Sequence, residues 1–585
     1  MVQQLTLLGD EAVALGAIHA GLSAAYGYPG TPSTEIMEYL QIKAADGMDS
    51  SADGSFTAAW CTNEKTALEA ALGVSFAGKR AMATMKHVGL NVASDPYINS
   101  ALLGIKGGLV IAVADDPGMH SSQGEQDSRF YAFFALLPCL EPRNQQQAYD
   151  MCREAFDLSE QMHLPVMLRL VTRLSHARSN VLPAPARKQN ICSKAENKTE
   201  WMLLPSHARK NYITLINKQA ELQKWSAAHP VNKLEIEGNN ESYAVITSGL
   251  GGNYYEENLA DLKNARGYTP ARLHIGAYPL PEDSIRNLCE KAKEVLVIEE
   301  GQPFIEERLR GILPLPIKIK GRLANPADSD VIPRTGELDP DNVRRALGLP
   351  AKDSILKSLP KGNAASVFAE GTIARPPQLC QGCPHADSYE ALNKAVAMLD
   401  GKSGHPSVCI NSDIGCYSLG AAPPYSAIES IVCMGASVGM ARGAADAGIP
   451  YAFAVVGDST FIHSGLTHLV DAVEANTPMT LIILDNSTVA MTGCQPTAFP
   501  TAKLKNLILG TGLDPAHYVE LEAKKQFLEA NTAKLHAEAE YRGLSVVVFV
   551  RECLEARVSN WHLSKLSSVS TVHAKYQFSC SRWQH

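Results

Sequence analysis

The sequence predicts a multi-domain α/β protein built on parallel sheets. Buried-strand runs such as Leu109–Ala114 and Pro165–Leu170 alternate with helical patterns, and the same alternation returns twice further along the chain. Strands of parallel sheets are covered on both faces, so they appear as continuous apolar runs and not as alternating ones. A chain of 585 residues has room for about three or four such domains.

Composition excludes several functional classes. The net charge of −8 comes from 53 basic and 61 acidic residues that are spread along the chain, so no basic stripe suggests a nucleic-acid partner. The apolar runs are strand-sized, which predicts no membrane span. The first residues lack the pattern of a signal peptide, and 13 cysteines in so long a chain are not a disulfide framework. We therefore expect a cytoplasmic protein.

Shifts in composition indicate the domain boundaries. The segment around 185–240 is rich in Lys, Asn, Gln and Glu and holds one amphipathic helix, Thr214–Trp225. Strand candidates Tyr243–Thr247 and Glu294–Ile298 mark a further α/β segment. We predict α/β domains at 1–184, 241–350 and 372–560, linkers at 185–240 and 351–371, and a tail at 561–585.

The most informative segment is a strand–helix–strand unit in the last domain. The apolar run Ala452–Val456 leads into Gly457-Asp458, a helical pattern follows, and the run Leu481–Leu484 ends at Asp485-Asn486. One crossover separates the two runs, so both carboxyl ends should lie at one edge of the sheet, where ligands bind.

Polar groups at this edge suit a metal ion. The Asp458 carboxylate, the Asn486 amide oxygen and the backbone carbonyl of Thr488 would form half of an octahedral oxygen shell. Mg²⁺ would complete that shell with diphosphate oxygens of a ligand and a water.

A hydrolase is an alternative interpretation of the same region. Gly435, Ser437 and Gly439 match the Gly-x-Ser-x-Gly nucleophile elbow, with Asp458 and His463 downstream. Against it, His463 follows Asp458 by only five residues, and Asp485-Asn486 has no role in a hydrolase.

Nine segments together resemble one family, and the resemblance extends over nearly the whole chain. The family is the thiamine diphosphate (ThDP)-dependent 2-oxoacid:ferredoxin oxidoreductases, and the similarity is to the large (alpha) subunit of its indolepyruvate branch. The segments are Leu8–Ala12, Gly27–Ser33, Asn63–Glu69, Thr84–Asn91, Asp115–Gln123, Cys380–His385, Asp413–Tyr417, Cys433–Ser437 and Gly457–Gly465.

The resemblance implies roles for the predicted domains. Residues 1–184 would bind the aminopyrimidine of ThDP, residues 372–560 its diphosphate, and residues 241–350 would resemble the transketolase C-terminal domain. It further implies oxidative decarboxylation of aryl 2-oxoacids such as indolepyruvate and phenylpyruvate to aryl-acetyl-CoA and CO₂. Coenzyme A is then a co-substrate, a small (beta) subunit the partner in a hetero-oligomer, and ferredoxin or another one-electron carrier the acceptor.

Site residues follow from the same resemblance. Glu64 matches the acid that hydrogen-bonds the aminopyrimidine; the alternative is an ordinary solvated glutamate at a helix N-terminus. Thr31 would lie near the reacting carbonyl, and His120, a further catalytic candidate, lies with Ser121 and Ser122 in a loop just beyond the strand Leu109–Ala114. All four positions also suit simple turns. Lys86 and His87 carry a weaker signal. The cofactor-binding set is Tyr28, Pro29, Gly30, Glu64, Cys383, His385, Gly415, Gly435, Ala436, Ser437, Gly457, Asp458, Ser459, Thr460, Asn486, Thr488, Met491 and Thr492.

Four cysteines match the ligands of a 4Fe-4S cluster in related oxidoreductases: Cys380, Cys383, Cys416 and Cys553. A Cys-x-x-Cys pair also allows zinc, and all four could be reduced structural thiols like Cys192, Cys289, Cys494 and Cys580. Only Cys580 follows Cys553, so we expect the family's C-terminal ferredoxin-like domain to be absent. The alternative function is a non-redox ThDP-dependent decarboxylase, or a regulatory subunit that kept the fold.

Overall fold

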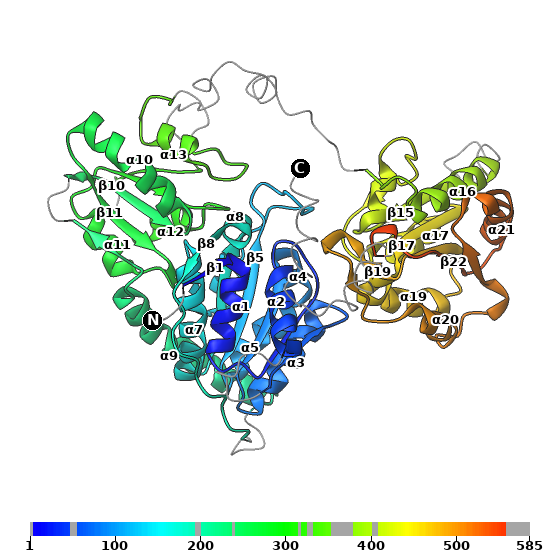
Figure 1. Ribbon diagram of the computed structural model, residues 1–585, viewed down its shortest axis with the longest axis horizontal. Coiled ribbons are helices and arrows are strands. Elements are labelled where there is room, and N and C mark those ends of the chain that lie inside the picture. The colour runs from blue at the N-terminus through cyan, green and yellow to red at the C-terminus, as the bar shows by residue number, and fades with distance from the viewer. Residues whose placement is uncertain are drawn as a thin grey trace. The chain divides into compact units, whose positions relative to one another are not determined.

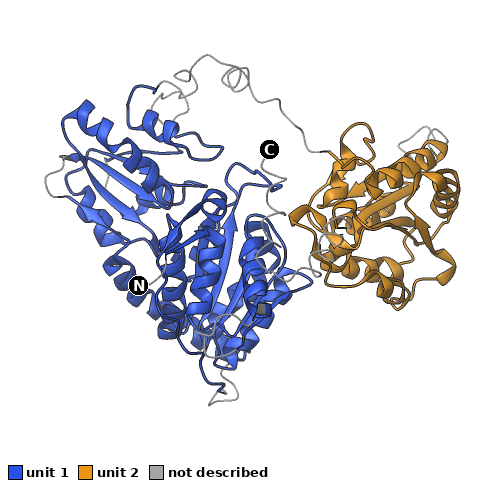
Figure 2. Ribbon diagram, in the orientation of Figure 1, with its two compact units in different colours: residues 1–371 blue, residues 372–585 orange. Residues whose placement is uncertain are grey.

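The computed structural model divides the chain into two compact units, residues 1–371 and 372–585, which Figure 2 colours separately. The predicted tail 561–585 and most of the predicted linker 351–371 lie outside the described residues. Among the helices that are described, none is both long and apolar enough to cross a membrane. The described residues are 4–46, 55–193, 201–236, 240–313, 317–323, 332–352, 378–399 and 408–556.

A seven-stranded sheet forms the centre of the first unit (Figure 1). Its order is β12 (Ala277–Tyr278), β6 (Cys139–Leu140), β7 (Val166–Val171), β5 (Leu109–Asp115), β4 (Ala81–Lys86), β2 (Ala24–Gly27) and β3 (Thr57–Trp60). All neighbours are parallel except β12, which pairs with β6 antiparallel. The parallel strands therefore present their carboxyl ends at one edge, where residues such as Gly27, Lys86 and Asp115 lie.

Helices pack against this sheet, with α7 on β5 and β7 and α3 on β2 and β4. Asparagine caps fix where both helices begin: Asn63 Oδ1 accepts from Thr66 N at 2.9 Å, and Asn144 Oδ1 from Gln147 N at 2.9 Å. The ladder of β1 (Leu5–Leu8) and β8 (Arg178–Val181) lies beside α1. The helices are α1 (Gly9–His19), α2 (Thr34–Asp46), α3 (Glu64–Phe76), α4 (His87–Val92), α5 (Ser94–Leu103), α6 (Arg129–Ala135), α7 (Gln145–Met162) and α8 (Thr172–His176).

The same unit holds a five-stranded sheet. Its order is β14 (Lys318–Lys320), β13 (Glu294–Ile298), β10 (Asn240–Ser248), β11 (Pro270–Ile275) and β9 (Leu234–Glu235). Strand β13 has the predicted bounds, whereas helix α9 (Pro205–Ala228) is longer than the predicted helix Thr214–Trp225. The predicted domain boundaries within residues 1–350 stay predictions. The remaining helices are α10 (Gly251–Arg266), α11 (Glu282–Cys289), α12 (Phe304–Ile312) and α13 (Pro340–Ala346).

Buried charges join the two sheets of the first unit. Arg169, on β7, donates from Nε to Asp115 Oδ2 at 2.7 Å and from Nη2 to the Glu300 carbonyl at 3.2 Å, and it also pairs with Glu141. Arg129 Nη1 lies 3.1 Å from Glu299 Oε2, just after β13. Burial raises the pKa of Glu299 to about 7. Because partners from both sheets compensate each charge, separating the sheets would leave buried charges unpaired.

The second unit contains a six-stranded, fully parallel sheet. Alternate residues of β17 enter two different core clusters, Phe453 and Val455 on one face and Ala454 and Val456 on the other. Both faces are thus covered, as the continuous apolar runs predict. The order is β16 (Ser430–Ile431), β15 (Val408–Ser412), β17 (Tyr451–Gly457), β18 (Met479–Asp485), β22 (Ser545–Val550) and β21 (Tyr518–Glu522). The helices include α16 (Pro384–Leu399), α17 (Ala436–Asp446), α18 (Asp458–Thr460), α19 (Leu466–Glu474), α20 (Thr501–Leu509) and α21 (Leu528–Glu540).

Candidate active site

Two aspartates meet at the carboxyl edge of the second unit's sheet. Strands β17 and β18 pair with Gly457 opposite Leu484, so the next residues, Asp458 and Asp485, come side by side. Both carboxyls are buried, and burial together with their mutual proximity raises the pKa of Asp458 well above its usual value. Burial also raises the pKa of Asp485, against hydrogen bonds from Thr501 and Ser487. A divalent cation would compensate this pair, so the residues present fit a metal ion.

The predicted metal ligands Asn486 and Thr488 follow directly. The Asn486 Oδ1 atom accepts from Thr488 N at 3.2 Å, while Thr488 Oγ1 donates to the Gln495 carbonyl at 3.0 Å. Asn486 Nδ2 lies 3.3 Å from Nε2 of His385. Burial lowers the pKa of His385 to about 4, so its ring is neutral and accepts this hydrogen bond. These contacts hold the Asn486 side chain beside Asp458 and Asp485 at one edge.

The second polar turn at this edge contains Gly435, Ala436 and Ser437. Gly435 has φ +82°, and a Cβ there would lie 2.7 Å from Ser464 Cβ, so only glycine fits. Both Ser437 N and Ser437 Oγ donate to Asp413 Oδ2, at 3.2 and 2.6 Å. The Ser437 hydroxyl is fully buried and bonded to a carboxylate, which contradicts its interpretation as a hydrolase nucleophile.

Asp413 is a site residue that the sequence analysis did not single out. It is the first residue after β15, and burial raises its pKa to about 6 against hydrogen bonds from Ser437 and Tyr417. The Tyr417 ring leaves no room for a side chain at Gly415 or Gly457, where a Cβ would lie 2.2 or 2.6 Å from Cε1. Asp413 therefore contacts the turn at Gly435 through Ser437, and the Tyr417 ring packs against the turn at Gly457.

The remaining predicted cofactor contacts of this unit lie on neighbouring loops. Thr460 Oγ1 donates to the Ile414 carbonyl at 3.2 Å, and Ser459 is half-buried beside it. Thr492 Oγ1 donates to Gln495 Oε1 at 2.6 Å, whereas the Met491 side chain is exposed. Met491 is thus available to a ligand.

The four predicted cluster cysteines act on one another electrostatically. Burial raises the pKa of Cys416 to about 12, and the charges of Cys383, Cys553 and Cys380 add to this rise. Burial likewise raises the pKa of Cys383 to about 11. The described side chains do not bring three metal-binding groups into range of one ion. The four thiols come from three separate segments, and the cluster itself stays a proposal.

Cys494 joins this group, although the sequence analysis placed it among structural thiols. A hydrogen bond with Cys494 lowers the pKa of Cys553 to about 6, against the effect of burial. Cys494 itself has a positive φ of 63° and lies in the short loop after β19 (Thr488–Val489). Of the other cysteines compared with it, Cys289 is buried and Cys192 exposed, and Cys580 lies outside the described residues.

Glu64 occupies the first position of α3 in the first unit. The residue is only 5% exposed, so it is not the solvated glutamate of the alternative interpretation. Its side chain lies against the backbone of Gly89, where a Cβ would approach Glu64 Oε1 to 2.4 Å. The pairing of β2 with β4 brings the segment after Lys86 beside the Gly27 end of β2.

The turn from Tyr28 to Thr31 lies at the same edge. Tyr28 and Pro29 are buried, and Gly30 N donates to Thr34 Oγ1 at 3.0 Å. The carbonyl of Thr31 accepts from Ser121 Oγ at 3.3 Å. Two of the predicted catalytic segments, around residues 31 and 121, are therefore in direct contact.

Asp116 accepts hydrogen bonds from the second of these segments, around residue 121. Burial would raise its pKa, but hydrogen bonds from Ser122, Ser121 and Thr172 hold the pKa below its usual value. His120 instead points outward and is exposed, with Nε2 3.1 Å from Glu337 Oε2. The structure thus brings Thr31 and Glu64 to the sheet edge and places His120 at its rim.

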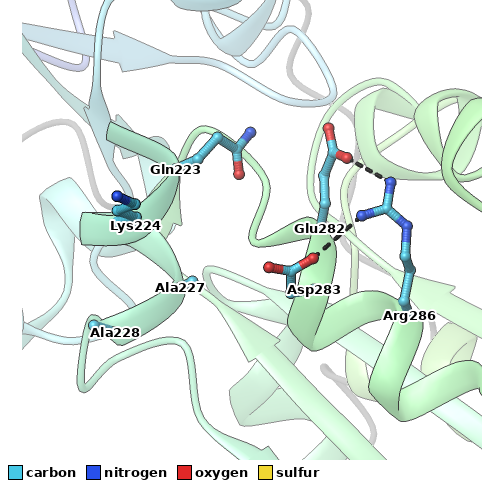
Figure 3. Close-up of a pocket in the computed structure, with 7 residues that line it drawn as sticks. All are labelled: Gln223, Lys224, Ala227, Ala228, Glu282, Asp283 and Arg286. Atoms are coloured by element: carbon cyan, nitrogen blue, oxygen red, sulfur yellow. Dashed lines mark hydrogen bonds and ion pairs between the residues drawn. The ribbon is translucent and has the colours of Figure 1, made fainter. Parts of the chain in front are cut away.

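A hollow of about 500 Å³ lies elsewhere in the first unit, between α9 and α11 (Figure 3). Arg286 in its wall pairs with Glu282 Oε2 at 2.7 Å and Asp283 Oδ1 at 3.3 Å. None of the predicted site residues lines it. We therefore do not assign it to the active site.

Comparison with known proteins places this geometry in a family. Residues 15–237 match the thiamine diphosphate-binding model of pyruvate flavodoxin/ferredoxin oxidoreductases, and residues 413–539 match the C-terminal domain model of thiamine pyrophosphate enzymes. These matches confirm the predicted α/β fold class with ThDP-binding domains.

Curated relatives match over most of the chain. The indolepyruvate oxidoreductase subunit IorA of Archaeoglobus fulgidus is 37% identical over 573 residues, covering 94% of this chain and 86% of the relative. The IorA subunits of Methanothermobacter thermautotrophicus and Thermococcus kodakarensis are 36% and 34% identical, each covering 84% of this chain and 76% of the relative. The chain belongs to the IorA family of indolepyruvate oxidoreductases, within the ThDP-dependent 2-oxoacid:ferredoxin oxidoreductases.

Proposed function

We propose that the protein catalyses oxidative decarboxylation of aryl 2-oxoacids, such as indolepyruvate and phenylpyruvate, to aryl-acetyl-CoA and CO₂. Electrons would leave one at a time to an iron–sulfur acceptor. The observation that carries the proposal is the buried Asp458–Asp485 pair beside Asn486, a donor set that suits a divalent cation. Family membership supplies the 2-oxoacid chemistry.

The chain's own residues would hold the cofactor. Asp458, Asn486 and the carbonyl of Thr488 would bind Mg²⁺, and backbone N–H groups of the turns at Gly435 and Gly457 would face the diphosphate. Glu64 would hold a proton against the aminopyrimidine. When bound, ThDP supplies the carbanion that attacks the 2-oxo carbon. Thr31, and His120 at the rim, would lie on the substrate side.

Partners and location follow from the family. The relatives are named as subunits, so we propose a hetero-oligomer with a small (beta) subunit in the cytoplasm. Coenzyme A would be the co-substrate, and ferredoxin or another one-electron carrier the acceptor.

Substrate preference tests the proposal. The chain purified with its small subunit is expected to reduce a one-electron dye when an aryl 2-oxoacid and coenzyme A are added. Steady-state rates with phenylpyruvate or indolepyruvate should exceed those with pyruvate and 2-oxoglutarate. Higher efficiency with the latter two would contradict the aryl assignment, and full activity of this chain alone would contradict the need for a partner.

Metal analysis tests the cluster. We propose that Cys380, Cys383, Cys416 and Cys553 bind one 4Fe-4S cluster, because they match the ligand positions of related oxidoreductases and the charges of the other three raise the pKa of Cys416. Protein prepared without oxygen should carry about four irons and four sulfides per chain, the content of a Cys₄-bound cubane. A Cys416→Ala variant should lose this iron, whereas Cys192→Ala, on an exposed thiol, should keep it. Zinc in place of iron, or full activity without iron, would favour the non-redox decarboxylase.

A further inference from the structure

Lys86 carries a charged group into a buried part of the first unit's sheet edge. The residue ends strand β4 and is 9% exposed. Its aliphatic stem packs on the turn after β2, since a Cβ at Gly30 would lie 3.2 Å from Lys86 Cδ. The ammonium lies over the loop that touches Thr31, because Nζ donates to the Ser121 carbonyl at 3.2 Å. An ammonium has three donors, and the described residues use one of them.

The charges around Lys86 compensate it only in part. Burial lowers its pKa to about 8, and Asp116 and Glu64 act in the opposite direction. The Asp116 carboxylate is already held by Ser121 N at 2.8 Å, Ser122 Oγ at 2.7 Å and Thr172 Oγ1 at 2.8 Å. A buried cation with unused donors destabilises the folded protein unless an anion accepts the remaining hydrogen bonds.

The other basic side chains near this edge each make a hydrogen bond to the protein, although His87 Nδ1 is buried without a partner. Arg173 Nη2 donates to Glu337 Oε2 at 2.9 Å, and His120 bonds to the same carboxylate. The ring of His87 bonds through Nε2 to the Gly124 carbonyl at 2.9 Å. Lys86 is therefore the cation best placed to meet an anionic ligand beside Thr31 and Glu64.

We propose that Lys86 binds the carboxylate of the 2-oxoacid substrate and so fixes which end of the substrate enters first. This inference rests on the proposed function. The ammonium would pair with the single carboxylate while the 2-oxo group lies toward the Thr31 turn. Decarboxylation removes that negative charge, so the same contact favours the substrate over the decarboxylated product.

Matched ligands separate charge recognition from packing. Lys86→Met keeps most of the stem and removes the charge. In the ThDP- and Mg²⁺-loaded complex, calorimetry should show a dissociation constant for 3-phenylpropionate raised about 10- to 100-fold, the range for loss of a charged hydrogen bond. The neutral 3-phenylpropanamide should bind both proteins alike. The KM for phenylpyruvate should rise more than kcat falls, and ThDP affinity should stay unchanged.

Three controls keep the result interpretable. Lys65→Met removes an exposed charge next to Glu64 and should change nothing. Lys86→Arg keeps a charge and should restore part of the affinity. Lys86→Met should melt at the same temperature or higher, because a poorly compensated buried charge is removed.

Other outcomes overturn the inference in distinguishable ways. Unchanged affinity for 3-phenylpropionate, or equal weakening of the acid and the amide, would give Lys86 a structural role only, with the proposed function intact. If the unaltered complex neither turns over phenylpyruvate nor binds 3-phenylpropionate, the proposed aryl 2-oxoacid function fails together with the inference.

Discussion

Replacing Asp458 by alanine is expected to abolish retention of ThDP and Mg²⁺ without unfolding the chain. The substitution removes a charged metal ligand and leaves the diphosphate charge poorly compensated. It also removes one of two buried carboxyls whose pKa values are raised. A raised carboxyl pKa means that the folded state binds more protons than the unfolded state, so the cost of burying the carboxyl grows as the pH rises from the ordinary aspartate pKa toward the raised one. The cofactor-free variant should therefore melt at the same temperature or higher.

Calorimetry and thermal melting together measure this. The unaltered chain should gain melting temperature when ThDP and Mg²⁺ are added, and Asp458→Ala should gain none. Asp471→Ala, on an exposed side chain of α19, is the matched control and should behave as the unaltered chain does. Equal ThDP affinity in Asp458→Ala and the unaltered chain would show the metal assignment to be wrong.

Glu64→Gln is expected to keep the cofactor and lose turnover. Glutamine fills the same space against Gly89 but cannot donate or accept the proton that the aminopyrimidine exchanges. General acid–base groups typically contribute about 10²- to 10⁴-fold, so kcat should fall by that factor. Initial rates with phenylpyruvate and coenzyme A, alongside the ThDP dissociation constant, measure both parts.

A second glutamate of the same helix provides the control. Glu69→Gln changes an exposed side chain of α3 and should leave kcat within about twofold, as for most surface substitutions. A Glu64→Gln enzyme that retains near-normal turnover would remove Glu64 from the catalytic role. Loss of ThDP binding in that variant would instead assign Glu64 to cofactor retention.

The sequence predicts the strands of this protein well, because parallel strands are apolar on both faces. The run Glu294–Ile298 became β13 without change, and Leu481–Leu484 became the centre of β18. Helix α9 was predicted short because its first turns carry no apolar periodicity: Tyr212 and Ile213 are exposed, and Leu215 is its first buried residue.

Side-chain partnerships across strands were harder to predict. Asp458 and Asp485 face each other because of the β17–β18 register, which no spacing along the chain reveals. Lys86 carried only a weak signal in the sequence, and its burial against Gly30 and its bond to Ser121 distinguish it. Cys494 approaches Cys553 through a loop with positive φ, and local sequence does not indicate that approach.

The buried charges around Arg169 limit where the chain can be divided into stable fragments. Strand β12, which follows the five-stranded sheet's β11 in the chain, completes the edge of the seven-stranded sheet, and Glu300 supplies a carbonyl to Arg169. A fragment ending near residue 184 would leave strand β6 without its partner β12. It would also remove the contacts of the buried Arg169 and Arg129 with Glu300 and Glu299. Truncated variants, fusions and domain exchanges should therefore keep residues 1–350 together, although this segment contains two sheets.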